Sequence, residues 1–259
     1  VIIPTTTTPD PGTGQATISN STSTVVVTSS SQPVILTVQS GTTNPKIDLS
    51  SFTTPTTINT IPVIQAIIPA ITITSNNINN QNNSIVISIP PTTTVTSQNN
   101  TWNGVILAPQ ISTVIPPSGA QIAGGIKIGT TNQRLVFDKA VRIAFPGQSG
   151  KLVAYSVTGS DWNPITTICT GDTQTDGDNM PPASDCKMNS GSDLVVWTKH
   201  FTDFNVYGEE VGAQSQLTGP KESAMNVGLD IGKTIALACD ATATLGTVNG
   251  YGQSTPGTV

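Results

Sequence analysis

The sequence predicts an all-β protein organised around a β-sandwich. Val, Ile and Thr are abundant along its 259 residues, and their branched Cβ atoms favour the pleated strand over the helix. The 19 prolines and 23 glycines divide the chain into short segments. Turn signals recur between these segments at intervals of about eight to twelve residues, which is typical of a sandwich.

The N-terminal part is expected to contain an extended tail followed by a β region. Residues 1–14 are rich in Pro and Thr, which favours an extended tail without a core of its own. Residues 15–83 form the N-terminal β region, in which β-branched residues gather in short runs. The predicted strands lie at residues 22–28 and 33–39, with two short strands or edge segments within 58–74.

The sandwich itself is predicted over residues 84–207, where short apolar or alternating segments follow one another between turn residues. Its strands are expected at residues 84–89, 92–96, 101–108, 122–128, 135–137, 141–145, 152–157, 194–198 and 204–207. A linker at 208–224 and a C-terminal β segment at 225–259 complete the chain. The C-terminal segment is expected to hold strands at 234–239 and 241–248.

Charge and hydropathy exclude two classes of partner. Charged residues make up 10% of the chain, and its net charge is −5. Because no cluster of Lys and Arg is available to neutralise phosphate groups, the sequence argues against a nucleic-acid partner. It also lacks an apolar run of about 18 residues, the length of a membrane-spanning helix. Pro62 and Pro69 interrupt its most apolar stretch, and proline disrupts a helix interior.

The densest run of large apolar and aromatic side chains covers residues 194–207, and it contains the single histidine of the chain, His200. We expect Val196, Trp197 or both in the sandwich core, because burying such large side chains is strongly favourable. The tripeptide His200-Phe201-Thr202 separates two β-type segments. It is predicted to form a bend between them.

Four features occur in a fixed order between residues 84 and 207. They are Trp102-Asn103-Gly104; residues 135–143 leading to Pro146-Gly147; Asp161-Trp162-Asn163-Pro164-Ile165; and Cys169 with Cys186 ahead of residues 194–207. This order resembles two related β-sandwich modules, the ZU domain of ankyrins and netrin receptors and the GAIN domain of adhesion receptors, over roughly half of the chain. The resemblance implies a sandwich that closes with a Trp-containing strand and a His-x-Thr/Ser corner, as in secreted surface proteins of prokaryotes.

The resemblance also implies a chemistry for the corner. Autoproteolytic members of these families cut themselves before the hydroxyl residue of a His-x-Ser/Thr tripeptide. Thr202 would then be the nucleophile, His200 the base and Phe201–Thr202 the scissile bond, and the peptide has to be strained for the N-to-O acyl shift. The alternative is a tight corner whose histidine is only hydrogen-bonded. From the sequence alone we expect this structural role, with the bond intact in most molecules and no catalytic residue.

We predict a disulfide between Cys169 and Cys186, which enclose a loop rich in Gly, Asp and Pro. Closing a loop of about 16 residues stabilises a fold by roughly 3 kcal/mol, and an extracellular setting permits the bond. Cys239 is then left over. Its apolar neighbours favour a buried free thiol, and intermolecular pairing is the alternative.

No metal site or other cofactor is expected. Neither a CxxC motif nor a Cys/His spacing suited to zinc is present. Residues 172–178 place carboxylates around Gly177, loosely as in a calcium loop. Ala183 stands where an EF-hand has its closing acidic ligand, so we expect a solvated turn here.

Several observations favour an extracellular or cell-surface location. Asn20, Asn82 and Asn99 each begin an Asn-x-Ser/Thr sequon, which makes them candidates for glycosylation. Lys is scarce and Thr, Ser and Asn are common, so the sequons can also have arisen by chance. The chain begins at Val1 without a basic-then-apolar leader, as expected of a mature secreted protein.

The leading functional hypothesis is a structural subunit of an extracellular filament or surface array. No Gly-x-Ser-x-Gly elbow or Walker loop occurs, so we do not expect an enzyme acting on an external substrate. The β-forming segments 22–39 and 234–248 lie outside the predicted sandwich and can pair with a neighbour's open edge. We therefore predict that residues 1–39 add a strand to the next copy and form a head-to-tail homopolymer. The alternative is that this strand folds back into its own sandwich.

Two further hypotheses remain open. The first is a self-cleaving surface module cut at Phe201–Thr202. The second is an adhesin or carbohydrate-binding module, which would need an exposed aromatic platform. Trp102 and Trp162 are the candidates for it, although both are expected to pack in the core.

Overall fold

The computed structural model describes residues 5–76, 84–112, 122–130, 133–157 and 161–208, together with residues 248–249 and 253–254. The chain divides into two compact units, Val1–Glu210 and Val211–Val259. In the second unit the described residues are two short antiparallel strands, β19 (Val248–Asn249) and β20 (Gln253–Ser254). The predicted linker at 208–224, apart from Gly208, and the predicted strand at 234–239 lie outside the described residues.

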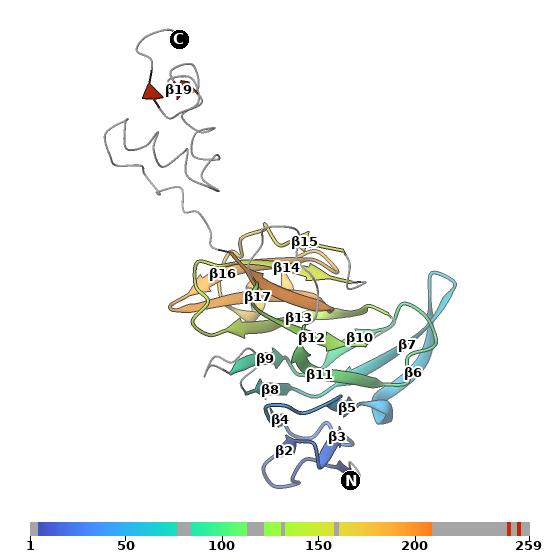
Figure 1. Cartoon of the computed structure of the whole chain (residues 1–259). Coiled ribbons are helices and arrows are strands. Elements are labelled where there is room, and N and C mark those ends of the chain that lie inside the picture. The colour runs from blue at the N-terminus through green and yellow to red at the C-terminus, as the bar shows by residue number, and fades with distance from the viewer. Residues whose placement is uncertain are drawn as a thin grey trace. The chain divides into compact units, whose positions relative to one another are not determined.

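The first unit has an all-β, sandwich-like fold, as the sequence predicts (Figure 1). We call its two layers sheet A and sheet B. In order across sheet A the strands are β1 (Thr5–Thr7), β3 (Thr22–Val26), β5 (Lys46–Asp48), β11 (Val105–Ile111), β12 (Ile122–Gly129), β18 (Asp203–Tyr207), β14 (Leu152–Ser156) and β15 (Asn163–Pro164).

Sheet B is forked at one long strand. Its strands in order are β2 (Gln15–Ile18), β4 (Val34–Val38), β8 (Ile71–Ser75), β9 (Ile85–Ile89), β13 (Leu135–Phe145), β10 (Thr93–Thr96), β7 (Ile61–Ile68) and β6 (Thr53–Ile58). β13 also pairs with β17 (Asp193–Phe201), which in turn pairs with β16 (Asp185–Ser190). Helical structure in the described residues is limited to η1 (Ser50–Phe52) and α1 (Gln174–Asp178), and no described helix is long and apolar enough to cross a membrane.

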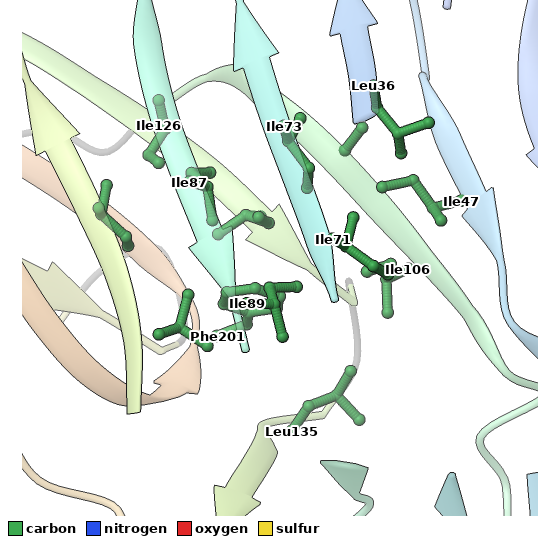
Figure 2. Close-up of a cluster of buried hydrophobic side chains, with 14 of the residues drawn as sticks. Leu36, Ile47, Ile71, Ile73, Ile87, Ile89, Ile106, Ile126, Leu135 and Phe201 are labelled. Carbon is green, nitrogen blue, oxygen red and sulfur yellow. The ribbon is translucent and has the colours of Figure 1, made fainter. Parts of the chain in front are cut away.

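The main core lies between the two sheets. Successive side chains of a strand point to opposite faces, so β8 and β9 alternate strictly between buried and partly exposed positions. Figure 2 shows side chains of both sheets meeting in this core. The labelled residues from sheet B include Leu36, Ile71, Ile73 and Ile87, and those from sheet A include Ile47, Ile106 and Ile126.

Strand β17 is buried on both faces. Val196 faces the main core, whereas Val195 and Trp197 join a second buried cluster with Ala140 and Cys186. A strand covered on both faces carries a nearly continuous apolar run, which explains the density of large side chains in this segment. The predicted burial of Val196 and Trp197 is confirmed.

The N-terminal strands wind back and forth between the two layers. β2 and β4 lie in sheet B and pair in parallel with each other, while β1, β3 and β5 lie in sheet A, where β3 pairs in parallel with both β1 and β5. β4 continues the series by pairing in parallel with β8. In Figure 1, β2 to β5 occupy the end of the unit opposite β14 to β16.

The expectation that residues 22–39 lack a sheet of their own is wrong. Val25 and Leu36 are fully buried in the main core, and their strands β3 and β4 pair with β5 and β8. The parallel partner of each strand lies many residues further along the chain, so local sequence patterns do not reveal it. Strands of residues 15–83 and of residues 84–207 thus share both sheets.

β13 replaces the two strands predicted at 135–137 and 141–145. Its register against β17 shifts between Val136 and Val141, which marks a bulge. Asp138 within this bulge accepts hydrogen bonds from the backbone N–H groups of Thr94 and Lys139 at 2.7 and 2.8 Å. These contacts satisfy backbone groups and keep the strand continuous through polar residues.

Candidate functional site

Thr202 is the point at which the chain passes from sheet B to sheet A. β17 ends at Phe201 and β18 begins at Asp203, so a single bent residue joins the two layers. Strands that switch sheets form the corners of a sandwich. The predicted bend in the His200-Phe201-Thr202 tripeptide is confirmed, at its last residue.

His200 lies between a carboxylate and a hydroxyl. Its Nδ1 is 3.4 Å from Oγ1 of Thr202, and its Nε2 is 2.8 Å from Oδ2 of Asp185. The histidine side chain is fully buried and that of Asp185 is 6% exposed. We call Asp185, His200 and Thr202 the corner triad, because they follow the acid–imidazole–hydroxyl order of nucleophilic hydrolases.

The corner triad favours one state of the imidazole. An ionised carboxylate only accepts hydrogen bonds, so the contact between Nε2 and Asp185 suits a ring that carries its proton on Nε2, with the lone pair of Nδ1 toward Thr202. Burial lowers the pKa of His200 below its ordinary value; the hydrogen bond and charge of Asp185 oppose this shift, and the charge of Arg134 adds to it. The neutral ring is thus the form that burial favours, and it can accept the Thr202 proton.

Aromatic neighbours fix the plane of the ring. Tyr155 of β14 meets His200 edge-on at 4.9 Å between centroids, and Phe204 of β18 stacks on it at 5.7 Å. The backbone of His200 is satisfied locally, since Thr198 Oγ1 accepts its N–H at 3.1 Å and donates to its carbonyl at 2.9 Å. This exchange occurs where the β13 bulge interrupts the ladder beside β17.

The peptide before Thr202 is held from both sides. Phe201 packs edge-to-face on Phe137 with ring centroids 4.6 Å apart. Gly129 approaches it so closely that an added Cβ would lie 2.8 Å from the Phe201 Cβ, and Gly129 has φ +106°, which other residues rarely adopt. Ile128 N–H donates to the Thr202 carbonyl at 3.3 Å. Phe201 and Thr202 therefore have little freedom to move.

Asp185 is placed by a strand and a disulfide. It opens β16, where it pairs with Thr198 of β17. The next residue, Cys186, is bonded to Cys169 with an S–S distance of 2.07 Å, so the predicted disulfide is confirmed. Asp185 was not among the candidate residues predicted from the sequence. Its position next to a half-cystine was the one available signal.

Replacing Cys169 and Cys186 by alanine is expected to lower the free energy of unfolding by about 3 kcal/mol, the value for closing a loop of this size. The change removes the link between β16 and the segment before α1 while leaving both strands of the β16–β17 hairpin intact. Urea unfolding with and without reductant measures it. A variant with unchanged stability would show that the bond does not constrain the unfolded chain.

The segment likened to a calcium loop is a short helix instead of a solvated turn. Thr173 and Asp176 form a capping box, each side chain accepting the other's backbone N–H at 3.2 Å. Asp172 pairs with Arg142 through two 2.8 Å hydrogen bonds, and Asp178 accepts the N–H of Ala140 at 2.7 Å. These carboxylates already have protein partners, and the described residues contain no group of three metal-ligating side chains.

The two tryptophans considered for an exposed carbohydrate-binding platform differ in burial. Trp102 is buried and donates from Nε1 to the Val105 carbonyl at 3.0 Å, so it offers no exposed platform. Trp162 is half-buried against Tyr207.

Of the sequons, Asn20 and Asn99 are exposed, while Asn82 lies outside the described residues, as does Cys239. Asn20 Oδ1 accepts from Thr43 and Asn99 Oδ1 accepts from Thr101, each from its backbone N–H at 2.9 Å.

Comparison of the chain with models of known protein families and with curated proteins gives no match. What the corner triad can do therefore follows from its own geometry.

Proposed function

We propose that the sandwich is a self-cleaving module that cuts its own Phe201–Thr202 bond. The observation that carries this proposal is the corner triad: Thr202 Oγ1 stands 3.4 Å from Nδ1 of a buried imidazole whose Nε2 is bound by Asp185. The sequence alone favoured a purely structural corner. The contact between His200 and Asp185 cannot be inferred from the sequence, and it favours self-cleavage over a purely structural corner.

The reaction is an acyl shift followed by hydrolysis. Nδ1 of His200 takes the proton of the Thr202 hydroxyl, and Oγ1 attacks the carbonyl carbon of Phe201. The bond between that carbon and the Thr202 nitrogen breaks, and the proton passes from Nδ1 to the nitrogen. Water then hydrolyses the ester, which leaves a carboxylate on Phe201 and a free amine and hydroxyl on Thr202.

Positioning is the main contribution that this structure offers to the reaction. Neither Phe201 nor Thr202 has a positive φ, so the proposed shift does not draw on left-handed backbone strain. Holding reacting groups in place can by itself lower a reaction barrier by several kcal/mol, roughly 7–11 kcal/mol in well-oriented cases. The packing of Phe201 between Phe137 and Gly129 supports this role.

Intact-mass spectrometry of the denatured chain tests the proposal. We expect two products, residues 1–201 and 202–259, which together account for the whole chain plus one water. The disulfide does not join them, because Cys169 and Cys186 both precede the cut. A single species of full mass after prolonged incubation of the folded protein would contradict the proposal.

A second proposed function is that of a structural subunit in an extracellular filament or surface array. The observation that favours it is the pair of outer strands β1 and β2, which end sheets A and B respectively in the described part of the chain. An outer strand presents unpaired backbone groups to which a strand of another copy can add. The disulfide supports an oxidising, extracellular setting.

This second function now predicts edge addition instead of strand exchange by residues 1–39, because their strands complete their own sandwich. Thr17→Lys places a charge at an exposed position of β2 and is expected to abolish filaments in electron micrographs, since edge charges oppose pairing. Ser40→Lys, at an exposed loop position, is the matched control. Filaments of unchanged length in Thr17→Lys would exclude β2 as the growing edge.

A further inference from the structure

The Asp185 side chain has one hydrogen-bond partner in the described part of the chain, and that partner is His200. Oδ2 binds Nε2 at 2.8 Å, whereas the buried Oδ1 makes no hydrogen bond. Burying a carboxylate is costly unless it is paired. Among the described residues no lysine or arginine pairs with it: Lys199 Nζ donates to the carbonyls of Asp178 and Met180 at 2.7 Å instead.

Arg134 does not pair with Asp185 either. Its Nη2 donates to the Ala183 carbonyl at 2.9 Å, and its Nε is buried without a hydrogen bond. The guanidinium lies 5.7 Å from the centre of the Tyr155 ring. A buried carboxylate whose side chain binds only an imidazole contributes little as an ion pair, and its defined effect is on the orientation of that imidazole.

We infer that Asp185 is the positioning residue of the corner: it fixes the Nε2–H tautomer of His200 and thereby leaves Nδ1 free to take the Thr202 proton. This inference rests on the proposed cleavage for its functional meaning. The tautomer itself is a property of the folded chain and can be measured separately. Asp185 does not touch the scissile bond, so it acts only through His200.

The scaffold around Asp185 suits this role. The β16–β17 pairing sets Asp185 beside Thr198, two residues before His200 on the neighbouring strand. The Cys169–Cys186 bond anchors the same end of β16. A carboxylate held in this way presents one oxygen to Nε2 and cannot swing toward solvent, because its side chain is only 6% exposed.

Nitrogen-15 NMR of the single histidine provides the test, since no other imidazole contributes signals. The Thr202→Val background keeps the shape of the side chain but cannot be cut, so the sample stays homogeneous. We expect a protonated Nε2 and an unprotonated Nδ1. In Asp185→Asn on this background, an amide N–H facing Nε2 is expected to move the proton to Nδ1. Asp193→Asn is the control, because that residue lies on the same hairpin and contacts Gly147 and Ser192 instead.

In the chain with Thr202 present, Asp185→Asn is expected to slow cleavage by about 100-fold or more, the scale of general base catalysis. A protonated Nδ1 with Asp185 in place would overturn the inference, even if no variant folds. An unchanged tautomer in a folded Asp185→Asn variant would also overturn it. A tautomer that shifts as expected in a chain that never cuts supports the positioning role and rejects the proposed cleavage alone.

Discussion

Thr202→Ala is expected to yield one uncut chain, whereas Thr202→Ser is expected to yield the same two products as the wild type. Alanine has no hydroxyl to attack the Phe201 carbonyl, while serine keeps the oxygen that lies 3.4 Å from His200 Nδ1. Without an activated nucleophile the acyl shift has no starting step, so the rate should fall below detection. Denaturing gels and intact-mass spectrometry over several days measure the difference.

His200→Ala should match Thr202→Ala, because the hydroxyl then has no base. Thr166→Ala, which removes an exposed hydroxyl, is expected to cut normally. The result that would contradict the mechanism is a Thr202→Ala chain that still gives residues 1–201. Such a cut would come from another protease or another nucleophile.

Trp197→Ala is expected to cost about 3–5 kcal/mol of unfolding free energy, as for other buried aromatic truncations. Trp197 is 3% exposed, and Gly177 of α1 packs so closely that a Cβ there would lie 2.5 Å from the indole Cε3. Its Nε1 also donates to Asp172 Oδ1 at 3.1 Å. The change therefore leaves a cavity and removes a hydrogen bond from the carboxylate that pairs with Arg142.

Thermal unfolding is expected to show this loss as a drop of roughly 6–20 °C in Tm, given about 2–4 °C per kcal/mol for a domain of this size. Trp162→Ala is the matched control, because Trp162 is only half-buried and should cost clearly less. Equal losses in both variants would contradict the prediction that the buried Trp197 contributes more to stability than the half-buried Trp162.

Local sequence patterns were sufficient for the β class, for many of the strands and for the corner. Alternation in β9 and the apolar run of β17 mark buried strands directly, because side-chain period and burial are local properties. The helix α1 also has a local signal in the sequence, the Thr-x-x-Asp spacing of its capping box. Its acidic residues drew attention to a calcium loop instead.

Contacts between segments that lie far apart in the chain could not be predicted from local sequence patterns. The parallel pairing of β2, β4 and β8 depends on partners separated by intervening strands of the other sheet. The contact between Asp185 and His200 depends on the register of β16 against β17, which pairs Asp185 with Thr198. A shift by one residue would point a side chain to the other face, and composition does not determine that register.

The interior position of β18 determines how a cut chain would respond to load. β18 is antiparallel to both β12 and β14, and residues 203–207 pair along both neighbours. Tension applied along the strand from the chain after Tyr207 would act on these two ladders in shear, so their hydrogen bonds would have to break together rather than one by one. A module cut at Phe201–Thr202 would thus keep both fragments joined at rest and part by withdrawal of this single strand.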